Sequence, residues 1–169
     1  GNAYAEYEIF TGLTLKSLVG IDYRARTFDR LISPLSSAGA GSTGGQGSLN
    51  QASNRRVKLI NTNTANFVRS FGDRHYVNFV LGNETLTEKF KSTTYTGYGI
   101  DPKRPVAAGI TQGTTSNGFI PVVGGSQTQN ALLSYFGNGT YTLDGRYNFS
   151  AGLRRDGSSK FGANNRWAT

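Results

Sequence analysis

Cysteine and methionine are absent from this sequence of 169 residues, and histidine occurs only once. Without cysteine the chain forms neither disulfides nor Cys-ligated metal sites, and one histidine cannot build a zinc site from several His ligands. No run of 18 apolar residues occurs, which excludes a membrane-spanning helix. No signal peptide or initiator methionine is visible, so we expect a processed product or a piece of a longer protein.

The residues that are abundant favour a membrane barrel over a soluble domain. Hydrophobic residues make up 36% of the chain, against roughly 45–50% apolar residues in soluble domains, while glycine reaches 23 residues. A barrel needs one apolar face per strand and aromatic girdles, which suits this composition. The net charge of +8 comes from scattered Lys and Arg, so we predict no nucleic-acid binding and a polar lumen instead.

Alternation of apolar and polar residues is the dominant pattern along the chain. One strand face would carry Leu13, Leu15, Ser17, Val19, Ile21 and Tyr23. The same contrast recurs over residues 77–82 and 147–154, and no segment shows a helical stripe. The predicted fold class is all-β.

Six strands in three hairpins follow from this pattern and from the turns. The predicted pairs are Ala3–Phe10 with Leu13–Leu31, Arg56–Phe71 with His75–Tyr95, and Ala131–Leu143 with Arg146–Phe161. Glycine permits tight turns within each pair, whereas long Gly/Ser/Thr-rich loops near 33–54 and 101–129 separate the pairs. This wiring is typical of antiparallel up-and-down strands in a transmembrane β-barrel. Six strands cannot close such a barrel, so other polypeptide would have to complete it.

A run near the end of the chain carries the strongest family signal. It consists of Arg154, Arg155, Asp156, Gly157, Ser158, Ser159, Lys160, Phe161 and Gly162. Together with the strand pair around Gly12, the segment Ser70–Gly72 and the segment Ser134–Gly137, it resembles the barrel of SusC/RagA-type TonB-dependent outer-membrane transporters. The similarity covers nearly the whole chain except its two long loops.

The resemblance implies a function and a set of partners. Members of this family import glycans or peptides across the outer membrane of Bacteroidetes through a plugged 22-stranded barrel. A SusD-like surface lipoprotein caps the barrel, and the TonB complex energises it through a plug region that has no counterpart here. We therefore expect a Gram-negative outer-membrane location, contact with lipid and lipopolysaccharide, and a glycan or peptide substrate.

Several residues are candidates for particular roles. In the run 154–162, we expect Arg155, Asp156 and Lys160 to form a charge and hydrogen-bond network that fixes a strand above the membrane, with an anion or glycan site as the alternative. Tyr95, Tyr98 and Phe119 are candidates for contact with substrate or with the lid protein. A periplasmic aromatic girdle is predicted from Tyr4, Tyr7, Phe10, Tyr76, Tyr141 and Tyr147, which cluster near the short turns.

Other motifs are interpreted as coincidental. The G-x-G-x-x-G pattern over 39–44 has no helix after it, and His75 has no serine in a nucleophile elbow to serve. We therefore predict no catalytic, cofactor or metal site and no enzyme. The alternative to a transporter is a secreted or surface β-sandwich that binds glycans or adheres to surfaces, in which the apolar face packs against a second sheet.

Overall fold

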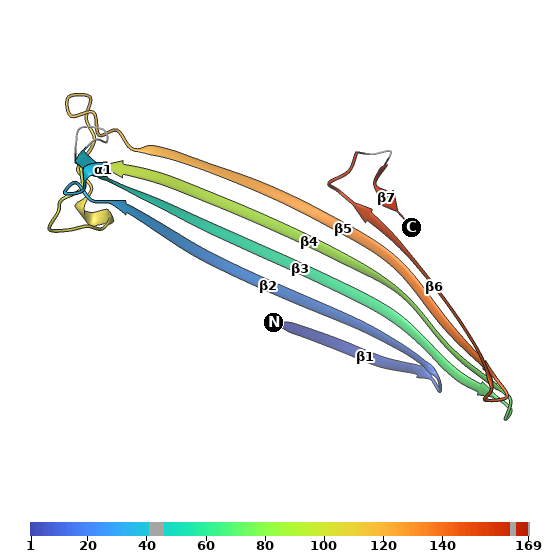
Figure 1. The fold of residues 1–169 in the computed structure, drawn as a ribbon. Coiled ribbons are helices and arrows are strands. Elements are labelled where there is room, and N and C mark those ends of the chain that lie inside the picture. Colours follow the sequence, from blue (N-terminus) through green and yellow to red (C-terminus); the bar gives the residue numbers. More distant parts are fainter. Residues whose placement is uncertain (41–45, 163–164, 169) are drawn as a thin grey trace. The chain divides into compact units, whose positions relative to one another are not determined.

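The computed structural model describes residues 1–40, 46–162 and 165–168, and these residues form an all-β chain (Figure 1). The strands are β1 (Asn2–Phe10), β2 (Leu13–Ile32), β3 (Ser48–Phe71), β4 (His75–Tyr98), β5 (Val122–Leu143), β6 (Tyr147–Ser158) and β7 (Trp167–Ala168). The helical parts are short, comprising α1 (Ser37–Ala40) and the 3₁₀ turn η2 (Ala107–Gly109). No helix in the described part of the chain is long and apolar enough to cross a membrane.

One sheet contains all seven strands in the order of the chain, from β1 to β7. The pairs β1–β2, β5–β6 and β6–β7 are antiparallel, as short hairpin connections require. The described residues form this one sheet and contain no second sheet packed against it. The predicted antiparallel up-and-down sheet is confirmed.

Glycine and aspartate shape the short turns. Gly12 has a φ of +96°, and a Cβ there would collide with the carbonyl oxygen of Val68, so the position requires glycine. Asp144 and Gly145 have φ values of 54° and 64°, the double positive φ that a tight hairpin turn favours. The predicted positive φ at these glycines is confirmed.

The strands extend further into the predicted loops than the sequence indicates. β3 begins at Ser48 rather than at Arg56, and β5 begins at Val122 rather than at Ala131. Segments rich in Gly, Ser, Asn and Gln are strands here because a neighbouring strand supplies backbone hydrogen bonds irrespective of side chains. The connections therefore shorten to residues 33–47 and 99–121, and the short β7 is an additional strand.

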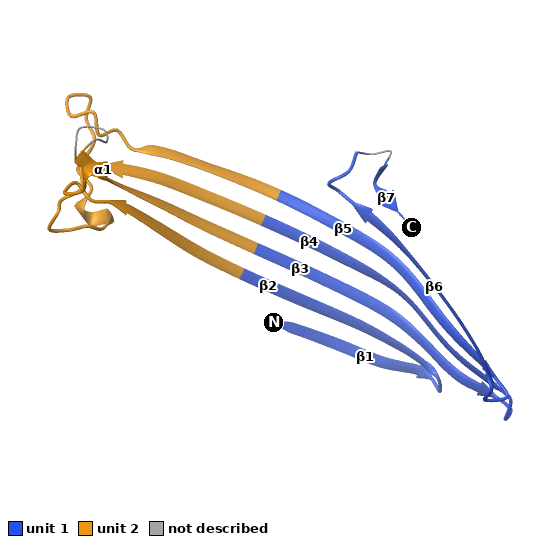
Figure 2. Ribbon diagram, viewed as in Figure 1, with its two compact units in different colours: residues 1–23, 57–89, 129–169 blue, residues 24–56, 90–128 orange. Residues whose placement is uncertain are grey.

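The chain divides into two compact units (Figure 2). Unit 1 comprises residues 1–23, 57–89 and 129–169, and unit 2 comprises residues 24–56 and 90–128. Strands β2 to β5 contribute residues to both units.

The buried hydrophobic side chains of the described residues all belong to unit 2. Leu49, Ile100 and Phe119 are 4%, 3% and 6% exposed. Backbone hydrogen bonds join the two long connections there, from the N–H of Ile100 to the carbonyl of Gln46 (2.8 Å) and from the N–H of Gly99 to that of Gly47 (3.3 Å). The described parts of the two predicted Gly/Ser/Thr-rich loops thus form a packed module with its own small core, which we call the loop module.

Candidate functional site

The sheet of unit 1 has two chemically different faces. In β1 and β2 the pairing sets Tyr7 beside Leu15 on one face and Glu6 beside Lys16 on the other. We call the first the apolar face. Its large exposed side chains are Tyr7, Leu15, Val19, Ile21, Tyr23, Phe79, Leu81, Tyr135, Tyr147, Phe149 and Leu153. Tyr7, Phe149 and Leu153 expose 71%, 61% and 68% of their surface.

The opposite, polar face carries a cluster centred on Arg154. The Arg154 Nε donates to Asp156 Oδ1 (2.9 Å), and its Nη2 donates to Ser134 Oγ (3.1 Å) and to Glu84 Oε1 (3.4 Å). Glu84 also accepts a hydrogen bond from the Thr62 hydroxyl (3.1 Å). The guanidinium lies 5.8 Å from the ring centre of Phe136. One arginine therefore connects β3, β4, β5 and β6 through side chains.

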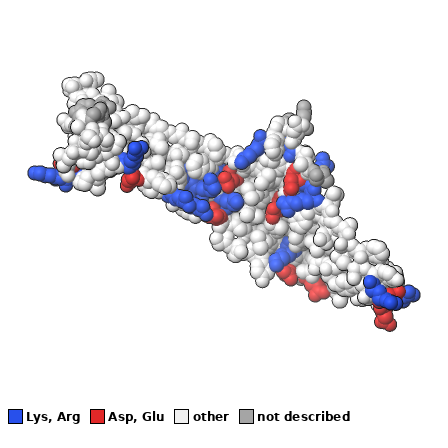
Figure 3. Space-filling model, viewed as in Figure 1, with Lys and Arg blue, Asp and Glu red and all other residues white. Residues whose placement is uncertain are grey.

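Opposite charges lie together on the surface. In Figure 3 the Lys and Arg groups lie next to Asp and Glu groups, and broad uncharged areas separate these mixed clusters. The pairs include Lys16 with Glu6 at 3.4 Å and Arg154 with Asp156 at 2.9 Å. In these pairs the positive charge of a basic residue is neutralised by a neighbouring carboxylate.

Comparison with known proteins gives one consistent result, although no family model matches the chain. The chain is 28% identical over 171 residues to the TonB-dependent receptor SusC of Bacteroides thetaiotaomicron, covering 100% of this chain and 16% of SusC. Solved structures of the RagAB peptide transporter match with a TM-score of 0.82, and with 0.83 in the open-open state. These two structures share 26% and 27% sequence identity with this chain. Each match covers 99% of this chain but only 18% of the matched RagAB chain.

Over its whole length the chain matches a segment of the SusC/RagA-type TonB-dependent outer-membrane transporters.

The resemblance seen in the sequence is confirmed. The outer membrane is the location of this chain. The chain spans about one sixth of the length of SusC. The named relatives are receptors and transporters rather than enzymes. Among the described residues there is no group of three or more His, Cys, Asp or Glu that could hold a metal ion. Of the G-x-G-x-x-G pattern, residues 41–44 lie outside the described residues.

The family run 154–162 differs in detail from the network expected for it. Asp156 pairs with Arg154, whereas Arg155 lies on the apolar face with its guanidinium 5.3 Å from the ring centre of Trp167. Consecutive strand residues face opposite sides, so the adjacent Arg155 and Asp156 cannot share one network. The sequence pattern already indicated this face for Arg155, because Arg155 lies two positions after Leu153 and so on the same side of the strand as the apolar residues of β6.

The rest of the run fixes the end of β6. The N–H of Ser159 donates to the carbonyl of Ala131 (2.9 Å), and the N–H of Ala131 donates to Ser159 Oγ (2.8 Å). The backbone N–H of Lys160 donates to Ser158 Oγ (3.2 Å). A Cβ on Gly157 would lie 2.9 Å from the Trp167 ring, so this glycine makes room for the indole. Beyond these contacts, Phe161 is exposed and Gly162 has open space around its Cα.

The three proposed ligand-contacting aromatic residues are not equivalent. Phe119 is 6% exposed within the packed loop module, where its ring lies against Gly99, and its contact with a ligand stays a prediction. Tyr95 and Tyr98 are half-buried and stay candidates.

The short-turn end of unit 1 is rich in aromatic side chains and carries an ion pair between two turns. Arg74 and Asp144 meet through two hydrogen bonds of 2.5 and 2.9 Å, which join the β3–β4 turn to the β5–β6 turn. The Arg74 hydrogen bond lowers the pKa of the Asp144 carboxyl, and the same bond raises the pKa of Arg74. Beside this pair, His75 Nδ1 lies 2.7 Å from the Tyr141 hydroxyl, which gives the histidine a structural partner.

Several of these functional residues were missed at the sequence level. Glu84, Ser134 and Thr62 are separated from Arg154 by 70, 20 and 92 positions, so only the strand register brings them together. Trp167 was missed because it follows the last predicted strand. In the sequence, Trp167 could have been noticed only as an aromatic residue that follows a polar segment.

Proposed function

We propose that this chain forms part of the barrel wall of an outer-membrane TonB-dependent importer of glycans or oligopeptides, and that its long connections form part of the outer vestibule. The observation that carries the proposal is the division of unit 1 into an exposed apolar face and a hydrogen-bonded polar face. A sheet with these two faces is matched to lipid on one side and to a hydrated lumen on the other.

The lengths of the strands support this placement. From the short turn at Tyr147 to Arg155, β6 runs for nine residues, and β4 runs for nine from His75 to Asn83. A tilted strand needs about nine to eleven residues to cross the hydrocarbon core. The short turns would then face the periplasm, and the long connections would lie on the outer side.

The loop module is the proposed contact surface for substrate and lid. Leu35, Val106, Ile120 and Val123 are exposed apolar side chains in or next to the two long connections. Exposed apolar side chains of this kind fit a protein partner, which we propose to be a SusD-like surface lipoprotein. Tyr95 and Tyr98 are the proposed contacts for a glycan or peptide. The TonB complex would act on the plug of the whole transporter.

The Arg154 cluster is proposed to be structural rather than a substrate site. The Nε and Nη2 donors of Arg154 are directed at Asp156, Ser134 and Glu84, so these atoms of the guanidinium tie neighbouring strands together. No bond chemistry is proposed for this or any other residue, and the role of the wall is passive.

The experiment is purification of the native protein that contains this sequence, followed by an uptake assay. We expect a large species that requires detergent, co-purifies with a surface lipoprotein and imports oligosaccharides or oligopeptides into cells. A folded protein that stays soluble without detergent would contradict the barrel wall. A detergent-requiring barrel with neither lipoprotein nor uptake would contradict the importer while leaving the wall intact.

A further inference from the structure

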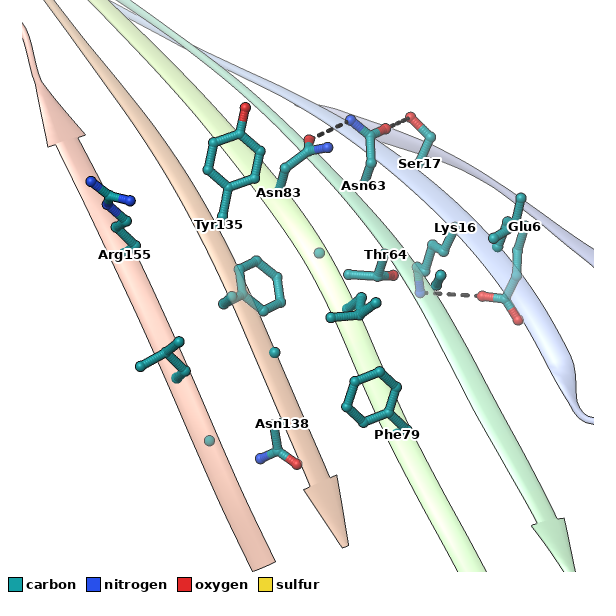
Figure 4. A pocket seen from close by; sticks show the side chains of 18 of the residues that line it. Glu6, Lys16, Ser17, Asn63, Thr64, Phe79, Asn83, Tyr135, Asn138 and Arg155 are labelled. Carbon is teal, nitrogen blue, oxygen red and sulfur yellow. Dashed lines mark hydrogen bonds and ion pairs between the residues drawn. The ribbon is translucent and has the colours of Figure 1, made fainter. Parts of the chain in front are cut away.

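The apolar face of unit 1 contains a groove with a polar end (Figure 4). Its volume is about 1230 Å³, larger than the roughly 300–1,000 Å³ of pockets for drug-sized ligands. Gly137, Ala65 and Ala151 give the groove its low floor, and Phe79, Leu81 and Leu153 are the large apolar side chains that line it. The shape and chemistry suit a long apolar ligand.

A row of polar side chains crosses the groove at one level. Ser17 Oγ donates to Asn63 Oδ1 (2.7 Å), and Asn63 Nδ2 donates to Asn83 Oδ1 (3.0 Å). Figure 4 shows Tyr135 and Arg155 following in the same row on the next two strands. Five neighbouring strands thus each place a polar group in one row across the face that is otherwise apolar.

Arg155 supplies the charge at this end of the groove, and aromatic rings hold it there. Trp167 stacks on Tyr135 with ring centres 6.2 Å apart and lies beneath the Arg155 guanidinium. Trp and Tyr gather where hydrocarbon meets water, so these rings mark the level of the lipid headgroups. The row lies nine residues from the short turns in β4 and β6, the length of one crossing of the hydrocarbon core.

We propose that the groove binds one lipid of the outer leaflet, with an acyl chain along Gly137 and Ala151 and a phosphate of its headgroup at Arg155. This inference rests on the proposed barrel wall, since it requires the apolar face to meet lipid. The cation complements the anionic phosphate, and a groove open along its length accepts a chain without enclosing it. The Asn63 and Asn83 amides add hydrogen-bonding groups at the headgroup level.

The test uses the full-length transporter, purified in detergent and incubated with monophosphoryl lipid A or with its dephosphorylated form. Lipid retained after gel filtration is measured by mass spectrometry. We expect Arg155→Gln to weaken retention of the phosphorylated lipid roughly fivefold, from about 1 kcal/mol per basic residue near an anionic surface. With the dephosphorylated lipid, Arg155→Gln should have no effect. Arg146→Gln, the same change in a short turn, should leave retention unchanged with both lipids.

A second variant tests the acyl-chain part of the groove. Ala151→Leu fills the floor with an apolar side chain at an exposed position and should lower retention about tenfold or more, because apolar sites discriminate strongly by size. Ala3→Leu makes the same change outside the groove lining and should retain lipid normally. Equal retention by all variants, or an equal loss with Arg146→Gln, would overturn the proposal.

A measurement on the unmodified protein covers the case in which a variant does not fold. A lipid A analogue with a photoreactive group in its acyl chain should crosslink to the peptide that contains Ala151 and Leu153. Crosslinks spread evenly over the apolar strands would refute a defined site. A transporter that needs no detergent would instead refute the proposed function itself, so the two failures are distinguishable.

Discussion

Unit 1 and unit 2 place their large apolar side chains in opposite surroundings. In unit 1, Tyr7, Phe149 and Leu153 are mostly exposed on one sheet face, whereas in unit 2 Leu49, Ile100 and Phe119 are buried among the loops. In the proposed barrel wall, residues of similar hydrophobicity would be stabilised by lipid in unit 1 and by protein packing in unit 2. Exposure of an apolar side chain therefore has a different meaning in each unit.

Truncating one phenylalanine in each unit is the strongest test of this comparison. Phe119→Ala removes a buried ring, and a Phe-to-Ala change in a packed core costs about 3–5 kcal/mol. We expect the loop module to open while the strands stay paired. Protease digestion of intact cells should then cut within residues 99–121. Phe149→Ala, at an exposed position on the apolar face, is the control and should leave the loops resistant. Equal cleavage in both variants would refute the packed module.

Adjacent residues on opposite faces provide the next test. Phe79 lies midway along the nine residues from His75 to Asn83 on the apolar face, and Val80 points to the other face. Arginine on a lipid face near the bilayer midplane costs about 2–4 kcal/mol, and lumen positions tolerate it. Phe79→Arg should therefore lower the urea midpoint of unfolding from liposomes, whereas Val80→Arg should change it little. The reverse order would mean that the two faces have been assigned the wrong way round.

The Arg154 cluster should contribute less, because its groups are partly exposed. Replacing Arg154 by Gln removes both ion pairs, and exposed pairs contribute about 1 kcal/mol or less. We expect a small loss of thermal stability with uptake unchanged once the protein is folded. Uptake that falls with no change in stability would show instead that Arg154 contacts the substrate.

The smallest expected effect is that of pH on the turn pair. The hydrogen bond from Arg74 lowers the pKa of the Asp144 carboxyl below its ordinary value, so the pair stabilises the folded state above that ordinary pKa. This contribution is lost as the pH falls through the lowered pKa of the folded state. Melting temperatures between pH 5 and pH 2 should therefore decline more steeply for the wild type than for Asp144→Asn. Parallel curves would show that the pair adds nothing to stability.

The sequence predicts a strand well where the strand's own residue pattern determines the structure, and poorly where contacts with distant residues determine it. Alternation identified β6 and the hairpin around Gly12, because most residues on one face of β2 and of β6 are apolar. The start of β5, from Val122, has no such alternation and is a strand because its neighbours supply hydrogen bonds. Burial of Phe119 depends on its contact with Gly99, twenty positions earlier, which no local pattern contains.

The candidate site shows the same division. The sequence located the family run at the end of a strand, but Arg155 was expected to share a network with Asp156 rather than to lie on the apolar face. Which carboxylates meet Arg154 depends on the register of four strands, so Glu84 was visible only as a distant acidic residue.

The identity of strand order and chain order has a consequence for how such a sheet forms. Each strand pairs with the strand that precedes it in the chain, so every hairpin closes a local segment and no long crossover has to be threaded. The sheet can therefore grow from either end by one hairpin at a time, and each new edge is the template for the next. The width of such a sheet then depends on the number of hairpins in the chain. Duplication of a hairpin would widen a barrel without changing which of the other strands pair.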